Sequence, residues 1–326
     1  MKILLTGGAG YIGSFMVKRL LDEGHQVIVA DSLVRGHRAF VDKRAPLEVG
    51  DLSDEQFLTS LFGHHYFDAV IHFAGFISMG ESMENPGMYF LDNTMVSVKL
   101  LDKMQEKGVK KFIFSSTAGV YGNPTKIPIT EDHSKKPTNP YGESKLMVEQ
   151  ILRWYGDIHG INSVCLRYFN AAGAALDGSM GEDHEPESHL IPSIIRSILN
   201  KSDFTLYGDD YKTKDGTCVR DYIHVLDLVE AHILALGKID KDQGSFIYNV
   251  GTGNGYSNKE VIDTVERVTG QKLTVKIVSR RPGDADTLIA DSTKIKNELG
   301  FAPAHSDIET IVQTAWKWHI NGHKNQ

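Results

Sequence analysis

The chain of 326 residues carries 35 lysines and arginines against 42 aspartates and glutamates, giving a formal net charge of −7. This balance excludes the broad basic surface that binding to nucleic acid or to an anionic membrane would need. No run of 18 apolar residues occurs and the first strand pattern begins at once, without a signal-peptide pattern, so we expect a cytoplasmic protein.

A glycine-rich turn near the amino terminus lies between a short apolar run, residues 2–5, and a helical apolar pattern, residues 12–21. A dinucleotide-binding motif requires this strand, turn and helix context. Gly8, Gly10 and Gly13 match the spacing G-x-G-x-x-G, which lets the backbone turn tightly, approach the pyrophosphate and pack the helix on the strand. An ordinary tight turn is the alternative interpretation of these glycines.

A second predicted strand, residues 26–31, ends on an acidic side chain. Asp31 lies 18 residues after Gly13, close to the offset of about 20 residues expected for the carboxylate that binds the ribose hydroxyls and repels a 2′-phosphate. We therefore predict NAD, rather than NADP, as the cofactor. The residues of this region predicted to contact it are Gly7, Gly10, Tyr11, Ile12 and Asp31.

Short apolar runs alternate with amphipathic segments up to about residue 117. The runs at 47–49, 68–73 and 110–115 are predicted strands with helices between them, a rhythm that predicts a parallel, doubly wound sheet of the Rossmann type. The carboxyl ends of such strands present ligands at the switch point of the sheet, although each residue taken singly could be a turn residue. The residues predicted to line the cofactor trough there are Asp51, Leu52, Phe73, Ala74, Gly75, Asn93 and Ser115.

The pattern loosens after residue 170 into loops rich in glycine and histidine, with short helices predicted at 190–200 and 257–269. We expect a dinucleotide-binding domain over residues 1–170 and a smaller α/β substrate-binding lobe mainly over 171–326. The strand pattern at 246–251 is expected to return to the main sheet, so that segments near 220–251 belong to the first domain and the lobes interleave. A last amphipathic stretch, residues 306–320, closes the small lobe or packs on a partner.

Two cysteines, Cys165 and Cys218, show neither metal-ligand spacing nor a disulfide framework. We interpret both as packing residues, and we predict no metal site.

Proton-transfer chemistry is predicted at Thr117, Tyr141 and Lys145. Tyr141 and Lys145 are spaced i, i+4, so on a helix beginning at Asn139-Pro140 they share one face. A free phenol, with a pKa of about 10, is a poor base at neutral pH, and a neighbouring ammonium and an oxidised nicotinamide would favour the phenolate. Thr117, at the end of a predicted strand, offers a hydroxyl that shares or orients the substrate proton. The spacing Tyr-x-x-x-Lys alone is also common on exposed helices.

Four motifs together carry a family resemblance. They are Thr6-Gly-Gly-Ala-Gly-Tyr-Ile-Gly13, Asn139-Pro-Tyr-Gly-Glu-Ser-Lys145, Arg167-Tyr-Phe-Asn-Ala-Ala-Gly173 and the segment 211–228. With them the chain resembles, over nearly its whole length, the extended short-chain dehydrogenase/reductase family, and within it the NAD-dependent nucleotide-sugar epimerases. The resemblance implies that Tyr141 is the general base, Lys145 the group that tunes its pKa, and Thr117 the accompanying hydroxyl.

The same resemblance implies interconversion of UDP-galactose and UDP-glucose through a transient 4-keto sugar, with the UDP group as a fixed handle. It places Tyr168 at the nicotinamide. It also implies substrate contacts from Thr117, Tyr141, Asn170, His189, Leu190, Tyr207, Arg220, Arg281 and Asp284. Arg220 and Arg281 suit the diphosphate because a guanidinium binds two oxygens at once, although each could instead pair with a nearby aspartate.

The chain departs from its relatives at two positions. Phe76-Ile77 stands where many members have Leu-Lys near the cofactor, so a cation at the nicotinamide side is missing. Leu288 stands where some relatives carry a tyrosine that crowds an N-acetyl group, so UDP-GlcNAc and UDP-GalNAc are additional expected substrates. By resemblance alone we expect a homodimer built on helices near 88–104 and 141–155.

Three alternative functions stay open. A nucleotide-sugar 4,6-dehydratase would need an acid and a base after the threonine, where this chain has Ala118-Gly119. An enzyme acting on UDP-glucuronate is excluded only by a substrate assay. A protein that binds NAD as a sensor without turnover would have no need for Tyr141 and Lys145 together.

Overall fold

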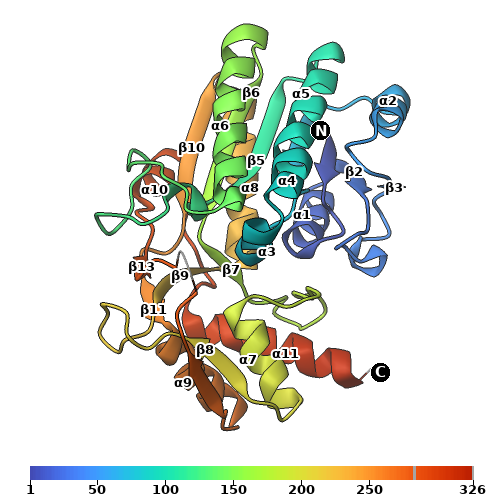
Figure 1. The fold of residues 1–326 in the computed structure, drawn as a ribbon. Helices are drawn as coiled ribbons and strands as arrows, with labels where there is room; N and C mark the ends of the chain where they lie inside the picture. The colour runs from blue at the N-terminus through green and yellow to red at the C-terminus, as the bar shows by residue number, and fades with distance from the viewer. Residues whose placement is uncertain (282–283, 325–326) are drawn as a thin grey trace.

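The computed structural model describes residues 1–281 and 284–324. A seven-stranded sheet forms the centre of the larger lobe, and a smaller lobe lies at the carboxyl edge of that sheet (Figure 1). The strands of the large sheet are β1 (Lys2–Thr6), β2 (Gln26–Asp31), β3 (Leu47–Val49), β4 (Ala69–His72), β5 (Lys111–Thr117), β6 (Asn162–Tyr168) and β10 (Ser245–Val250).

The seven strands are all parallel, in the order β10-β6-β5-β4-β1-β2-β3. The chain moves outward in one direction from β1 to β3 and in the other from β4 to β6, so the switch point lies between β1 and β4. The predicted doubly wound sheet is therefore confirmed, and β10 returns to it as expected, pairing with β6 from Ser245↔Ser163 to Val250↔Tyr168. The boundary near residue 170 stays a prediction.

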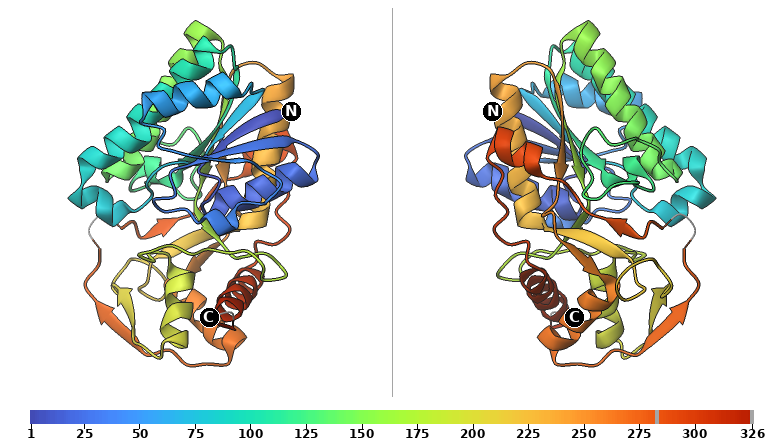
Figure 2. Two further views of the ribbon diagram at one scale, coloured as in Figure 1. Left: turned by 90° about the vertical axis from the view of Figure 1, so that its right-hand side faces the viewer. Right: turned by 90° about the vertical axis from the view of Figure 1, so that its left-hand side faces the viewer.

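Helices cover both faces of the sheet (Figure 2). Alternate side chains of a buried parallel strand point to opposite faces, and both faces are apolar here. Ile3 and Leu5 pack with α1 (Tyr11–Asp22) and α8 (Val225–Lys241), whereas Leu4 packs on the opposite face. The helices of that second layer are α2 (Glu55–His64), α5 (Val96–Glu106) and α6 (Pro140–His159).

The smaller lobe has its own apolar core, built from α7 (Leu190–Leu199), α9 (Asn258–Thr269), α11 (Ile308–Lys324) and β8 (Phe204–Tyr207). The predicted last amphipathic stretch thus closes this lobe, since Ile311 and Val312 of α11 are fully buried in it. Its other strands are β7 (Asn170–Ala172), β9 (Val219–His224), β11 (Gly255–Ser257), β12 (Val275–Val278) and β13 (Thr287–Leu288).

The helix expected over 88–104 is divided into segments. A short helix α4 (Pro86–Tyr89) is followed by a π-helical segment, Phe90–Met95, and then by α5. The remaining short elements are α3 (Met79–Glu84), α10 (Thr293–Leu299) and the 3₁₀ turns Arg38–Phe40 and Ala118–Tyr121. Within residues 1–281 and 284–324, no helix is long and apolar enough to cross a membrane. Cys165 and Cys218 are buried and unbridged.

A buried ion pair joins α6 to the sheet. Arg167 on β6 is 1% exposed and donates from Nη2 to Glu149 Oε2 on α6 at 2.5 Å and from Nε to Glu149 Oε1 at 2.9 Å. The Ser116 hydroxyl of β5 donates to the same carboxylate at 2.5 Å, and the Arg167 Nη1 donates to the Tyr121 hydroxyl at 2.8 Å. The pair therefore ties α6 to β6 and to the end of β5, one residue before Thr117.

We expect Glu149→Ala to lower the free energy of unfolding by about 3–5 kcal/mol, because it leaves the Arg167 guanidinium buried without its counter-charge. Chemical denaturation of the purified protein measures the change. The exposed Glu106→Ala serves as a control and should shift stability by less than about 0.5 kcal/mol. Equal stability of Glu149→Ala and wild type would show that the ion pair between Glu149 and Arg167 does not stabilise the packing of α6 on the sheet.

Candidate functional site

A large cavity of about 950 Å³ runs along the carboxyl ends of the parallel strands and into the small lobe. It begins at the glycine-rich turn after β1, passes Asp31 at the end of β2 and Thr117 at the end of β5, and reaches Arg220 on β9. The predicted site residues that line it are Gly7, Gly10, Tyr11, Ile12, Asp31, Asp51, Leu52, Phe73, Ala74, Gly75, Ser115, Thr117, Tyr141, Tyr168, Asn170, His189, Leu190, Tyr207, Arg220, Arg281 and Asp284.

The glycine-rich turn and Asp31 form one hydrogen-bonded unit at the amino end of α1. One oxygen of the Asp31 carboxylate accepts from the Ala9 amide and the other from the Leu33 amide, each at 2.9 Å. A Cβ at Gly13 would stand 2.1 Å from the Gly7 carbonyl oxygen, so only glycine allows the helix to begin this close to the turn. This leaves a cradle of backbone and one fixed carboxylate at the cavity wall, which fits the pyrophosphate and ribose of a dinucleotide.

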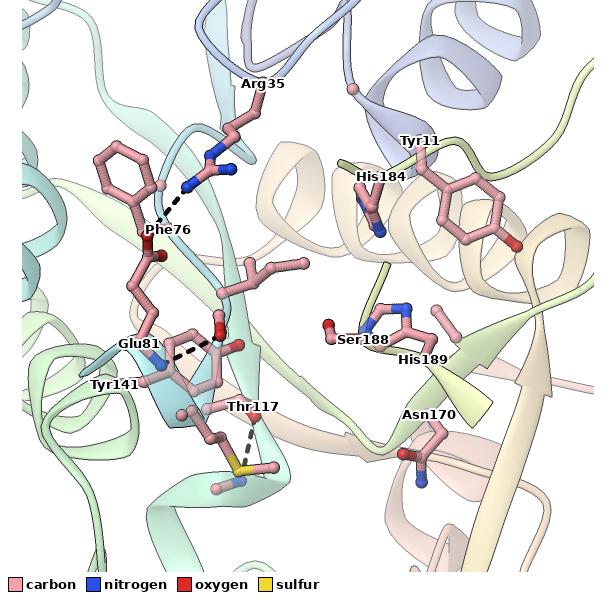
Figure 3. A pocket seen from close by; sticks show the side chains of 18 of the residues that line it. Tyr11, Arg35, Phe76, Glu81, Thr117, Tyr141, Asn170, His184, Ser188 and His189 are labelled. Carbon is pink, nitrogen blue, oxygen red and sulfur yellow. Dashed lines mark hydrogen bonds and ion pairs between the residues drawn. The ribbon is translucent and has the colours of Figure 1, made fainter. Parts of the chain in front are cut away.

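Close packing between α6 and the turn after β5 places Tyr141 beside Thr117. The Asn139 side chain caps α6 by accepting from the Gly142 amide at 2.9 Å, and Pro140 occupies the first turn. A Cβ at Gly142 would stand 2.6 Å from the Gly119 carbonyl oxygen, so this contact also requires glycine. Burial raises the pKa of Tyr141, and a hydrogen bond with Thr117 acts in the opposite direction. Both side chains face the cavity in Figure 3.

Lys145 and Asn93 lie behind the cavity wall rather than on it. The point where a Cβ of Gly75 would stand is 2.8 Å from Asn93 Oδ1 and 3.6 Å from Lys145 Nζ. Asn93 binds both the amide and the carbonyl of Phe76, which fixes the backbone that carries the wall. Lys145 is 2% exposed with its Nζ 4.9 Å from the centre of the Phe114 ring, and burial lowers its pKa to about 8.

Lys145 is expected to lower the pKa of Tyr141. In this structure the shift of the Tyr141 pKa arises from burial and from the hydrogen bond with Thr117. Lowering of the Tyr141 pKa by Lys145 therefore stays a prediction for the protein with its cofactor. A second phenol faces the same region, because Tyr168 on β6 hydrogen-bonds the Ser115 hydroxyl. Burial, and then the negative charge of an ionised Tyr141, raise the pKa of Tyr168.

Arginines and aromatic rings gather at the far end of the cavity, in the small lobe. The Arg281 guanidinium lies 4.0 Å from the centre of the Tyr207 ring. Arg220 donates to the Ala285 carbonyl at 2.8 Å, and its Nη2 lies 3.7 Å from Asp284 Oδ1. Four residues predicted from the sequence, Tyr207, Arg220, Arg281 and Asp284, thus lie at this end of the cavity. The aspartate that pairs with Arg220 is Asp284, which also lines the cavity.

The segment 182–189 contributes residues that the sequence analysis missed. Glu182 and His184 line the cavity together with the predicted His189. His189 Nδ1 contacts Glu182 Oε1. Burial lowers the pKa of His189, but Glu182 and Glu187 together outweigh burial and raise the pKa to about 9. The signal was the spacing Glu-x-His-x-x-Glu-x-His in a loop already noted as rich in histidine. Arg35 and Glu81 also line the cavity and form an ion pair at 2.9 Å, but no sequence pattern comparable to that of 182–189 marks them.

Comparison with known proteins gives matches over nearly the whole chain. The family model for the NAD dependent epimerase/dehydratase family matches residues 3–251. A Streptococcus mutans serotype c protein named UDP-glucose 4-epimerase is 49% identical over 322 residues, 98% of this chain and 97% of that protein.

Two solved structures are similar over all or nearly all of their lengths. The UDP-glucose 4-epimerase from Bifidobacterium longum in complex with NAD+ and UDP aligns with a TM-score of 0.95 and 38% identity, covering 100% of both chains. The UDP-Glc/GlcNAc 4-epimerase from Campylobacter jejuni aligns with a TM-score of 0.85 and 39% identity, covering 98% of this chain and 99% of that chain.

Proposed function

The chain belongs to the NAD dependent epimerase/dehydratase family, and on that basis we propose that it interconverts UDP-galactose and UDP-glucose by inverting the sugar C4. One observation carries the proposal. A continuous cavity joins a dinucleotide cradle, the Tyr141 and Thr117 hydroxyls, and an arginine-bearing end that suits a diphosphate.

The NAD-binding end is proposed to consist of the glycine-rich turn, Asp31 and the strand ends. Backbone amides of the turn would bind the pyrophosphate, and the Asp31 carboxylate would accept from the ribose hydroxyls. Gly75, with Asn93 and Lys145 behind it, would form the wall beside the nicotinamide. Bound NAD supplies a hydride acceptor that returns the same hydride, so no net oxidation occurs.

Tyr141 is proposed to move the proton. Its phenolate would accept the proton of the sugar 4-hydroxyl as the C4–H bond breaks, and the Thr117 hydroxyl would orient that oxygen by hydrogen bonding. The 4-keto sugar then turns about its bond to the nucleotide and presents its other face. The Tyr141 hydroxyl would return the proton to the ketone oxygen as the C4–H bond reforms with the opposite configuration.

The small lobe is proposed to hold the UDP group throughout this rotation. Arg220 and Arg281 would bind diphosphate oxygens, with Tyr207 and Asp284 in contact with them and Asn170, His189 and Leu190 along the wall. Binding energy from the nucleotide, which does not react, keeps the complex together while the sugar is free to turn.

We expect Tyr141→Phe to lower turnover of UDP-galactose by about 10³-fold, because the variant lacks the group that transfers the proton. The epimerase reaction is run with no added cofactor and stopped, and the UDP-glucose formed is then measured with a UDP-glucose dehydrogenase and NAD+. Tyr66→Phe, at an exposed tyrosine outside the cavity, should keep wild-type turnover. Turnover by Tyr141→Phe at the wild-type rate would contradict the assignment of the base.

Absence of turnover by the wild-type protein, even with NAD supplied, would reject the epimerase proposal. An enzyme acting on another nucleotide sugar would then be tested with UDP-glucuronate. Retention of NAD without any turnover would favour the alternative that the protein binds NAD as a sensor.

N-acetylated sugars are proposed as additional substrates. Leu288 lines the cavity and is only half-buried, and the similar Campylobacter jejuni protein is named for both UDP-Glc and UDP-GlcNAc. We expect turnover of UDP-GlcNAc by wild type and a loss of about 10-fold or more in Leu288→Tyr, whose larger ring would fill the space of the acetyl group. Unchanged UDP-glucose turnover in the same variant is the control. Undetectable wild-type turnover of UDP-GlcNAc would reject this substrate range.

A homodimer is proposed through the outer faces of α5 and α6. Exposed apolar side chains gather on α6 at helical spacing, with Met147 36%, Trp154 56% and Ile158 67% exposed. Such a stripe on a surface helix is typical of a protein interface. Light scattering after gel filtration should give twice the chain mass, and Trp154→Glu/Ile158→Glu should give a monomer, whereas Tyr66→Glu should not. A monomeric wild type would reject the dimer.

A further inference from the structure

Four potential metal ligands converge within one short segment of the small lobe. Glu182, His184, Glu187 and His189 each place one ligand atom so that all four atoms lie within 4.8 Å of one another. Figure 3 shows His184 and His189 together at one side of the cavity, and the His184 ring lies 6.4 Å from that of Tyr11. The rings of His184 and His189 are 5.3 Å apart, centre to centre.

Two buried carboxylates meet here, and the basic side chains that face them are those of His184, His189 and Arg196. The Glu182 side chain is 4% exposed and that of Glu187 is 5% exposed. The cationic side chain paired with Glu187 is Arg196, whose Nη2 lies 3.8 Å away and is shared with Asp183 at 2.9 Å. Burial of two like charges at close range is costly unless a cation compensates them.

One buried oxygen of Glu187 accepts no hydrogen bond from the described residues. Its Oε1 accepts from the amides of Ser188 and His189, at 2.8 and 2.9 Å, but within the described residues its Oε2 has no hydrogen-bond partner. His184 Nδ1 is also buried, and it lies 2.9 Å from Glu182 Oε1, its ion-pair partner. A buried oxygen without a hydrogen-bond partner is rare, and a bound cation would account for the one on Glu187.

We propose that Glu182, His184, Glu187 and His189 bind one divalent transition-metal ion, for which Zn²⁺ is the best chemical fit. Imidazole nitrogens together with carboxylate oxygens suit zinc, whereas calcium and magnesium prefer oxygen alone. Tetrahedral zinc with bonds of 2.0–2.1 Å places its ligand atoms about 3.3 Å apart. Side-chain rotation would bring ligand atoms that now lie up to 4.8 Å apart to this separation. The ion neutralises both carboxylates.

The position of the site indicates a structural ion rather than one that acts on the sugar. The segment bridges the two lobes, because the Glu185 carbonyl accepts from Arg35 at 2.8 Å and the Glu182 carbonyl accepts from Trp318 of α11 at 2.9 Å. His37 also contacts the Asp183 carbonyl, at 3.1 Å. An ion with four protein ligands would fix this bridge and leave the proton chemistry at Tyr141 unchanged.

The test uses full-length, tag-free protein treated with a chelator, incubated with ZnCl₂ and then desalted for elemental analysis. We expect about one zinc ion per chain and a rise in Tm of about 4 °C over the chelated protein. His184→Gln/Glu187→Gln should retain less than about one tenth as much zinc, whereas the exposed-site control His64→Gln should bind like wild type.

The single variant His184→Gln provides a second measurement if the double variant does not fold, and it should lose most of the bound zinc. Wild-type protein without stoichiometric zinc would overturn the proposal, as would a folded double variant that binds as much zinc as wild type. Because zinc content and Tm are measured without substrate, the result is independent of the proposed epimerase activity.

Discussion

The buried contact between Glu149 and Arg167 is the constraint on which the arrangement of the site depends. It joins α6, the helix that carries Tyr141 and Lys145, to β6, and through Ser116 it also holds the end of β5 that carries Thr117. A charged pair fixes direction as well as distance, because each hydrogen bond has a narrow range of angles. Apolar packing alone, of Val148 and Leu152 against the sheet, would leave the helix free to slide by small amounts.

Two close backbone contacts complete this control of position. Gly142 allows α6 to touch the turn after β5, and Gly13 allows α1 to begin against the glycine-rich turn. One contact sets the proposed base beside its hydroxyl partner, and the other opens the cradle proposed for the dinucleotide. Both elements begin at the carboxyl edge of the sheet, so the parallel topology brings them to the same cavity.

The small lobe adds positively charged side chains to the cavity at the carboxyl edge of the sheet. Its arginines, Arg220 and Arg281, come from chain segments that follow β6 in sequence, and they line the cavity at the end away from the glycine-rich turn. The segment 182–189 runs between the lobes and carries buried carboxylates that the epimerase proposal does not use. The proposed substrate contact of His189 and the connection between the lobes therefore lie in one stretch of chain.

The sequence by itself determined the parallel sheet, the glycine-rich turn with Asp31, the placement of Tyr141 and Lys145 on one helix, and the position of Thr117 at a strand end. These features depend on local spacing: apolar periodicity, glycines at fixed offsets, and an i, i+4 pair on one helix. Only the tertiary structure decided that Lys145 and Asn93 stand behind the wall at Gly75, that Arg220 approaches Asp284, and that Glu182 and Glu187 share one buried site with two histidines. Burial and charge at these positions arise from elements distant in sequence, and a pattern read along one segment contains no information about what packs against it.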